Sequence, residues 1–393
     1  MGGWPAVSLG GVVLGQGKGR DFRKEERKIS MPFKLKGKRV IIPLAALLLA
    51  LGVLAPMTTA AAETSLTAAA LQANLNGAGA TFPQPVYIQW IGQFQSENHG
   101  VKINYQGVGS GAGITQFTAQ TLDFGASDAF MLPTELQAAQ AARKGAKVLQ
   151  IPTVFGSITL AYNLPGIKTL KLDSNTLAKI FLGKITKWND PALKSLNPGV
   201  NLPSTAIQTV HRSDSSGTTN AFTSYLASVN APWKAGPGVG KTVKWPNGVG
   251  GAGNAGVAAL VKQTKGAIGY VELAYATQNK ISVAQMKNKS GKFIAPSLAS
   301  TTAAAQGIKI PADFNLLPLV SNSANAQAYP IVTSTYLLAY NKWPDSNKAA
   351  AFKAFVTWAL GSDGTKVAQS LGYAPLPSAL HSAVLQEISQ IGS

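Results

Sequence analysis

The 393-residue sequence contains no cysteine. This absence excludes disulfide bonds, thiolate zinc sites and cysteine nucleophiles. Histidine is scarce as well, because the chain has only His99, His211 and His381, and no two of them stand at the short spacings of metal ligands. The sequence therefore predicts no metal site.

Acidic residues are also few. The sequence has 16 Asp and Glu against 35 Lys and Arg, a formal net charge of +19. A metal-dependent phosphatase needs several carboxylates and histidines around its ions, and these mostly isolated acids do not offer such a set. Beyond residue 62 the cations are scattered singly, with no basic run and no interleaved aromatics, so nucleic acid is not an expected partner.

The N-terminal region has the order of a secretory signal. A basic stretch at 34–39 precedes an apolar run at 40–54, and small residues follow at 59–62. The run of about 15 apolar residues is shorter than the roughly 20 that a membrane-spanning helix needs. We predict that 1–62 is a cleaved signal peptide with an N-terminal extension, that Met31 is an alternative start, and that the mature protein is periplasmic.

Arginine is rare in the mature chain. Residues 1–62 hold 10 of the 35 Lys and Arg and 3 of the 16 Asp and Glu, which leaves 25 basic and 13 acidic residues, net +12. Only two of these cations are arginines, Arg143 and Arg212. The guanidinium group presents a planar fork of donors that lysine lacks. We therefore expect at least one of the two to make a specific contact.

From Asn76 onward, short apolar strands alternate with helical patterns. Such alternation predicts an α/β fold with mostly parallel sheets. The expected strands are 101–106, 122–126 and 206–210, and the expected helices are 86–94, 133–143 and 222–229.

Three strand-to-helix junctions are rich in Gly, Ser and Thr: Asn76–Pro83, Gly107–Gly113 and His211–Thr219. A helix start leaves backbone N–H groups free and carries a partial positive charge. Glycines allow close approach of the backbone to a ligand, and hydroxyls add donors. One such junction is an ordinary capped helix, whereas three, the last with Arg212, predict an anion-binding cradle.

The second junction also allows a dinucleotide interpretation. Gly107–Ala112 matches the G-x-G-x-x-A fingerprint, and Asp123 and Asp128 lie near the place of a ribose-binding acid. The motif stands alone, and an enzyme exported by the general pathway would leave its cofactor behind. We expect no cofactor.

A secreted phosphatase or hydrolase that uses Ser110 is the alternative function. Ser110 lies in a glycine loop, but Val108–Ala112 does not fit the G-x-S-x-G nucleophile elbow. The three histidines have no evident acid partner in the sequence, although a catalytic triad is assembled in space.

Several long segments, in order from about Asn76 to the C-terminus, resemble the periplasmic phosphate-binding proteins of phosphate ABC transporters. The resemblance is carried by Gly77–Pro83, Asn104–Ser110, Asp123–Asp128, Ser216–Thr218, Val243–Pro246, Gly266–Glu272 and Pro330–Thr335.

This resemblance implies the type II periplasmic binding protein fold, with two α/β lobes joined by two hinge-crossing strands. Lobe I would comprise 63–154 and 331–393, and lobe II 155–330. The strands would cross near 151–154 and 330–333. One buried, dehydrated phosphate would lie between the lobes.

The resemblance also implies the ligand residues. Asp214 would hold the guanidinium of Arg212, and Phe82 would bind through its backbone N–H. The implied phosphate ligands are Thr81, Phe82, Ser110, Asp128, Arg212, Ser216, Gly217 and Thr218.

The chain departs from the usual family pattern at Gly111, at His211 and within Ser213–Ser216, which leaves the implied ligands intact but affects fine affinity. Two plainer interpretations stay open. Thr81 and Ser110 could be helix caps, and Arg212 with Asp214 could be a surface ion pair.

Asp128 is an unusual residue for an anion site, because a carboxylate repels an anion. It fits a ligand that carries a proton, such as phosphate, and would exclude sulfate. The sequence thus predicts a monomeric binding protein, not an enzyme, that takes inorganic phosphate in the periplasm and delivers it to the permease subunits of an ABC transporter.

Overall fold

The structure, a computed structural model, describes residues 71–392. The predicted signal peptide, 1–62, and the alternative start at Met31 lie outside the described residues. In the described part, no helix is long and apolar enough to cross a bilayer.

The described strands are mostly short, and β4 is the exception with 15 residues. They are β1 (Ala73–Gly79), β2 (Val101–Gly107), β3 (Phe124–Ser127), β4 (Val148–Tyr162), β5 (Lys171–Leu172), β6 (Gln208–Arg212), β7 (Val249–Gly251), β8 (Ala267–Glu272), β9 (Ser282–Val283), β10 (Gln285–Lys287), β11 (Phe293–Ile294) and β12 (Val332–Tyr340).

Helices separate most of these strands. They are α1 (Gln84–Glu97), α2 (Ser110–Thr118), α3 (Pro133–Ala142), α4 (Ser174–Phe181), α5 (Pro191–Leu196), α6 (Gly217–Val229), α7 (Ala231–Ala235), α8 (Gly253–Gln263), α9 (Leu273–Gln278), α10 (Leu298–Ala305), α11 (Leu317–Val320), α12 (Ser346–Leu360), α13 (Ser362–Ser370) and α14 (Ser378–Ser389).

Nine of the described strands form one sheet, in the order β2-β1-β3-β12-β4-β8-β6-β7 with β9 beside β4. The N-terminal part of β4, Val148–Ser157, pairs with β12, and the C-terminal part, Ile158–Tyr162, pairs with β8. We call β2, β1, β3, β12 and Val148–Ser157 the first half-sheet. Ile158–Tyr162 with β8, β6, β7 and β9 is the second half-sheet.

All 15 residues of β4 are buried, which explains why its sequence is almost continuously apolar or threonine-rich. Pro152 cannot donate to a strand neighbour. It stands where the register against β12 shifts, between Thr335 and Tyr336. The bulge therefore accommodates the proline inside a central strand.

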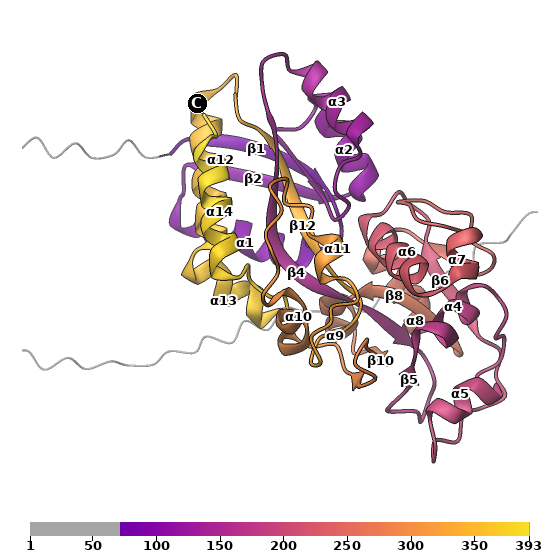
Figure 1. Ribbon diagram of the computed structural model, residues 1–393. Helices are drawn as coiled ribbons and strands as arrows, with labels where there is room; N and C mark the ends of the chain where they lie inside the picture. Colours follow the sequence, from indigo (N-terminus) through magenta and orange to yellow (C-terminus); the bar gives the residue numbers. More distant parts are fainter. Residues whose placement is uncertain (1–70, 393) are drawn as a thin grey trace, which may run out of the picture. The chain divides into compact units, whose positions relative to one another are not determined.

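Helices far apart in the sequence cover the first half-sheet. Figure 1 shows the C-terminal helices α12, α13 and α14 in yellow, and of these α12 packs on the N-terminal strand β1, α13 on α1 and α14 on β4. Helix α1 packs there with five buried residues at helical spacing, Val86, Tyr87, Trp90, Ile91 and Phe94. This is the pattern that the sequence predicts for 86–94.

The α/β fold class is confirmed, but the sheet is more mixed than expected. Strands β1, β2 and β3 are parallel to one another, as are β6, β7 and β8, whereas β12 and β4 run antiparallel to their neighbours. The two central strands, β4 and β12, cause this difference, and of the two only β4 belongs to both half-sheets. The expected strands 122–126 and 206–210 begin two residues later, at Phe124 and Gln208.

The described residues, 71–392, belong to one compact unit. The lobe boundaries 63–154, 331–393 and 155–330 stay a prediction. What matters for the site is the direction of the strands. Parallel strands of one half-sheet end at the same edge, so the loops after β1, β2 and β3 gather at one place and those after β6, β7 and β8 at another.

Candidate functional site

The first junction lies between β1 and α1. Thr81 is 5% exposed and Phe82 is fully buried. Their carbonyl groups accept hydrogen bonds from two buried tyrosines, Tyr275 Oη to Thr81 O at 2.5 Å and Tyr373 Oη to Phe82 O at 2.7 Å. The backbone N–H of Phe82 donates to no atom of the described residues. The two tyrosines thus fix this loop in place, and the backbone N–H of Phe82 remains available to a ligand.

The second junction lies between β2 and α2. Ser110 opens α2, is 1% exposed, and its Oγ accepts the backbone N–H of Asp128 at 3.2 Å. Gly109 before it has φ of 93°, a conformation that favours glycine. A Cβ on Gly109 would lie 2.3 Å from Asp214 Oδ2, so this loop contacts the third junction directly.

Asp128 follows β3 and is 1% exposed. Its Oδ1 accepts Thr335 Oγ1 at 2.9 Å and its Oδ2 accepts Thr218 Oγ1 at 3.3 Å. Burial raises the pKa of the Asp128 carboxyl to about 7, although the hydrogen bonds and the charge of Arg212 act in the opposite direction. Asp128 can therefore gain or lose a proton near neutral pH.

The third junction begins at Arg212, the last residue of β6. Asp214 holds its guanidinium through two hydrogen bonds. Arg212 Nε donates to Asp214 Oδ1 at 2.7 Å, and Arg212 Nη2 donates to Asp214 Oδ2 at 2.5 Å. The Arg212 side chain is 1% exposed, so the pair is not the surface ion pair considered above. Burial opposes ionisation of Asp214, but the bonds and charge of Arg212 lower its pKa below the ordinary value.

Helix α6 completes this junction. Ser216 caps it, with Oγ accepting the backbone N–H of Thr219 at 3.0 Å. A Cβ on Gly217 would lie 2.5 Å from Ser110 Oγ and 2.7 Å from Asp128 Cβ. Only glycine permits this approach, which brings the start of α6 against the first half-sheet.

The nine residues singled out in the sequence therefore lie together, where the loops of the two half-sheets meet. Thr218 Oγ1 links them, because it accepts Arg212 Nη1 at 3.3 Å and donates to Asp128. Direct bonds also join the two sides elsewhere, such as Gly111 N–H to Ser215 O at 2.9 Å. Whether each of the nine contacts a ligand stays a prediction.

Sequence reasoning missed Asn254, in the first turn of α8. Its side chain is fully buried and bonds to both Thr81 and Thr218. A usable signal was present, because Gly250–Asn254 is a fourth glycine-rich strand-to-helix junction, after β7. Thr335, the partner of Asp128 on β12, gave no such signal.

A second buried carboxyl, Glu272, lies at the end of β8. Its Oε2 accepts Ala274 N–H at 2.7 Å and lies 2.8 Å from Tyr373 Oη, and its Oε1 has no partner among the described residues. Burial raises the pKa of Glu272 to about 8. Tyr373 thus connects Glu272 with the carbonyl of Phe82.

The chemistry of the assembled site is that of anion recognition. It combines backbone N–H groups at helix starts, hydroxyls and one guanidinium with two carboxyls, that of Asp214, which pairs with the guanidinium, and that of the buried Asp128. Among the described residues, no three His, Asp or Glu gather as metal ligands. No described histidine bonds to Ser110, and His211 instead stacks on Trp245 with ring centroids 4.8 Å apart.

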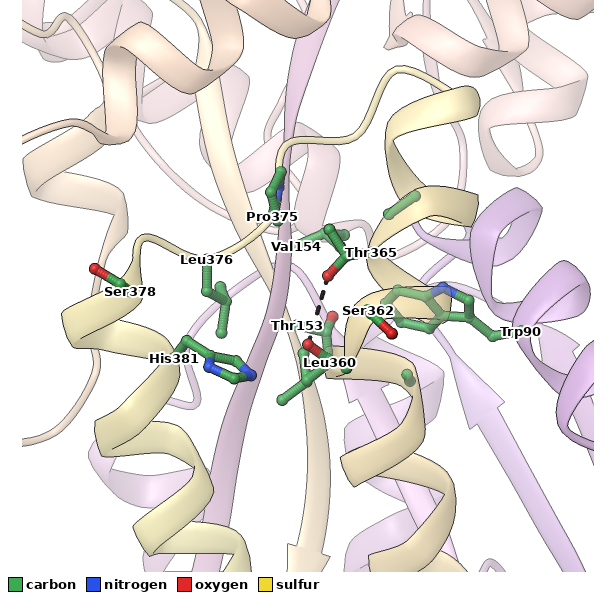
Figure 2. A pocket seen from close by; sticks show the side chains of 13 residues that line it. Trp90, Thr153, Val154, Leu360, Ser362, Thr365, Pro375, Leu376, Ser378 and His381 are labelled. Carbon is green, nitrogen blue, oxygen red and sulfur yellow. Dashed lines mark hydrogen bonds between the residues drawn. The ribbon is translucent and has the colours of Figure 1, made fainter.

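A cavity of about 310 Å³ lies elsewhere, and Figure 2 shows it between Trp90, Thr153 and His381. Its walls come from α1, from the first half-sheet and from the helices after β12. None of the nine predicted residues lines it, so this cavity is separate from the candidate site.

Comparison with known proteins places the chain in a family. A family model described as "PBP superfamily domain" matches residues 61–363. Phosphate-binding protein PstS of Pasteurella multocida is 43% identical over 305 residues, 77% of this chain and 86% of that protein. The protein of the same name from Haemophilus influenzae is 44% identical over 317 residues, 80% and 92% of the two chains.

Solved structures share the fold. A high-affinity periplasmic phosphate-binding protein, PfluDING, bound with phosphate, aligns with a TM-score of 0.67 at 23% identity over 82% of this chain and 99% of that chain. A putative phosphate ABC transporter substrate-binding protein from Clostridium perfringens, with bound phosphate, aligns with a TM-score of 0.55 at 19% identity, over 78% and 100%.

Proposed function

Because the chain belongs to the phosphate-binding proteins of the PBP superfamily, we propose that it binds inorganic phosphate and delivers it to an ABC-type phosphate importer. The phosphate would lie where the loops of the two half-sheets meet. The proposed ligands are Thr81, Phe82, Ser110, Asp128, Arg212, Ser216, Gly217 and Thr218, with Asp214 holding Arg212.

The observation that carries the proposal is the pairing of many donors with one buried carboxyl. Arg212 and the helix starts supply positive charge and N–H donors, while Asp128 is a buried acceptor with a pKa near neutrality. Phosphate near pH 7 is an anion that still carries a P–OH group. A fully ionised oxyanion such as sulfate has no proton for Asp128, so this combination supports phosphate as the ligand.

A binding role without turnover is part of the proposal. Ser110 Oγ accepts a backbone N–H and has no histidine beside it, so nothing in the described residues favours the hydrolase alternative. A nucleophilic serine would need an adjacent base.

The proposed location is the periplasm, reached through cleavage of the signal peptide 1–62, and the proposed partners are the permease subunits. We propose that it acts as a monomer, because all nine proposed site residues belong to one chain. Mass spectrometry of a periplasmic extract should find a mature N-terminus close to Glu63. A full-length chain retained in the membrane fraction would contradict export with cleavage.

Calorimetry of the phosphate-stripped mature protein tests the function. We expect saturable binding of phosphate and no comparable binding of sulfate, of NAD or of a generic phosphoester, and no hydrolysis of the ester. Binding of NAD would revive the dinucleotide interpretation, and turnover of the ester would revive the hydrolase. Absence of phosphate binding by the refolded protein would contradict the proposal itself.

A further inference from the structure

Asn254 is a fully buried amide in the first turn of α8, at the meeting point of the two half-sheets. Burying an amide without hydrogen-bond partners costs free energy. Its side chain is fully engaged: Nδ2 donates to Thr81 Oγ1 at 2.9 Å and to Thr218 Oγ1 at 3.2 Å, and Oδ1 accepts the N–H of Glu272 at 2.9 Å.

These partners fix the orientation of the amide. A backbone N–H can only donate, so the atom facing Glu272 has to be the oxygen of Asn254. The nitrogen therefore faces the two threonine hydroxyls and donates one proton to each. In the flipped amide, two N–H groups would face each other and a buried donor would be lost.

The direction of the Thr81 proton follows from this orientation. A hydroxyl accepts at most two hydrogen bonds and donates one. Thr81 Oγ1 receives both the side-chain Nδ2 of Asn254 and its backbone N–H, the latter at 3.1 Å. Both acceptor positions are filled, so Thr81 can only donate to any further group.

The Thr218 hydroxyl likewise has both of its acceptor positions filled. Its Oγ1 receives Arg212 Nη1 at 3.3 Å and Asn254 Nδ2 at 3.2 Å, and its own proton is directed to Asp128 Oδ2 at 3.3 Å. Two hydroxyls that could in general donate or accept are thus both set as donors by one amide.

We propose that Asn254 is a positioning residue of the phosphate site, which sets the Thr81 and Thr218 hydroxyls as obligate donors without touching the ligand. This inference rests on the proposed function, because it requires that these threonines lie at the phosphate. Asn254 would thereby contribute to specificity, because hydroxyls that cannot accept a hydrogen bond exclude ligand groups that can only donate one. The bonds of Asn254 to Thr81 also join the second half-sheet to the first.

Two substitutions separate this role from simple space filling. In Asn254→Asp the shape is kept, but a carboxylate draws the Thr81 proton away from the ligand and the Thr218 proton away from Asp128. In Asn254→Ala the hydroxyls become free to turn. We expect calorimetry to show phosphate affinity lowered about tenfold in Asn254→Ala and about 30-fold or more in Asn254→Asp. A residue that only filled space would tolerate Asp better than Ala.

The matched control is Asn288→Asp, at a buried amide that bonds to the carbonyls of Ala326 and Ala328, far from the three junctions in the sequence. We expect this variant to bind phosphate as the unaltered protein does. Thermal unfolding of each phosphate-free variant shows whether the fold is retained.

A double-mutant cycle distinguishes proton direction from added charge. If Asn254 acts through Thr81, the loss caused by Asn254→Ala should shrink to about twofold in a Thr81→Val background. Equal losses in both backgrounds, or unaltered affinity of Asn254→Ala, would overturn the inference, whereas the proposed function fails only if the unaltered protein does not bind phosphate. Should the variants not fold, neutron diffraction of the unaltered protein decides, and a flipped Asn254 amide overturns it.

Discussion

Arg212 is the one guanidinium at the candidate site, and its environment leaves little freedom. Asp214 occupies Nε and Nη2, and Thr218 receives Nη1. The remaining N–H groups of the fork are therefore presented in a fixed plane. A lysine would keep the charge but lose both the fork and the bidentate pair with Asp214.

We expect Arg212→Lys to lower phosphate affinity about tenfold or more, since charge-assisted hydrogen bonds in a buried site are the strong ones. Isothermal calorimetry measures the change. Arg143→Lys is the control, because Arg143 lies 4.1 Å over the Tyr340 ring at the end of α3 and should tolerate lysine. Unaltered affinity of Arg212→Lys would show that Arg212 is not a ligand.

Asp128 is the residue that should choose between phosphate and sulfate. When ionised it accepts a ligand proton, and sulfate offers none. Asp128→Asn can both donate and accept, so it should keep much of the phosphate affinity and bind sulfate about tenfold more tightly or better. Competition titrations with both anions measure this.

The control for that experiment is Asp123→Asn, just before β3, where the carboxylate pairs with Lys348 and is outside the nine predicted residues. If Asp128→Asn still ignores millimolar sulfate while it binds phosphate normally, Asp128 is not the selectivity element.

At the scale of the elements, the junctions after β8 and β3 each bury one carboxyl, Glu272 and Asp128. Burial raises their pKa values to about 8 and about 7. In the unfolded chain both groups ionise near pH 4. Between about pH 4 and the raised pKa, the folded protein therefore holds protons that the unfolded chain has lost.

This difference has a definite sign. The state that binds more protons gains from acid, so the free energy of unfolding of the phosphate-free protein should fall as the pH rises from about 4 to about 8. Each group contributes at most about 1.4 kcal/mol per pH unit. Asp214, whose pKa is lowered, acts in the opposite direction but only below about pH 4.

Urea unfolding at a series of pH values measures this slope. Glu272→Gln removes one titrating group and should flatten the curve. A phosphate-free protein whose stability is constant or rises between pH 5 and pH 8 would contradict the predicted protonation of Glu272 and Asp128.

The elements also show what sequence alone could give. Helix 133–143 and strand 101–106 were placed almost to the residue, because proline at a helix start and strict apolar alternation are strong local signals. The three junctions were found because Gly, Ser and Thr cluster before each helix.

The remainder of the site depends on contacts between distant segments. Thr335 and Tyr373 reach the junctions from β12 and from the segment before α14. Thr335 ends one of the segments that carry the resemblance, but neither residue lies in a junction rich in Gly, Ser and Thr. Asn254 looks like an ordinary turn residue after glycines, and its role appears only when Thr81, 173 positions earlier, is placed beside it. The antiparallel direction of β4 and β12 was likewise not predicted, because no local pattern records the direction of a strand.

At the scale of the whole molecule, the two half-sheets are joined across the site by direct bonds. Thr218 donates to Asp128, Asn254 to Thr81, and Lys241 forms an ion pair with Glu135 in which both side chains are mostly buried. A ligand can enter between such loops only when they part. Binding should therefore be accompanied by closure of a hinge at β4 and β12.

Small-angle scattering tests this motion. With phosphate removed and its removal verified, we expect a larger radius of gyration than with phosphate bound. The Arg212→Lys variant at the same phosphate concentration should stay nearer the larger value. An unchanged radius in the unaltered protein would argue for a rigid site.

Strand β4 also limits how chains of this kind can exchange parts by recombination. Because Val148–Ser157 pairs with β12 and Ile158–Tyr162 with β8, one uninterrupted strand belongs to both half-sheets. A single breakpoint after β4 would unite β3 of one ancestor with β12 of another in the same half-sheet. With two breakpoints, one between Ser157 and Ile158 of β4 and one before β12, the second half-sheet is transferred as one inserted segment. All strands of the first half-sheet then come from one ancestor, and all strands of the second half-sheet come from the other.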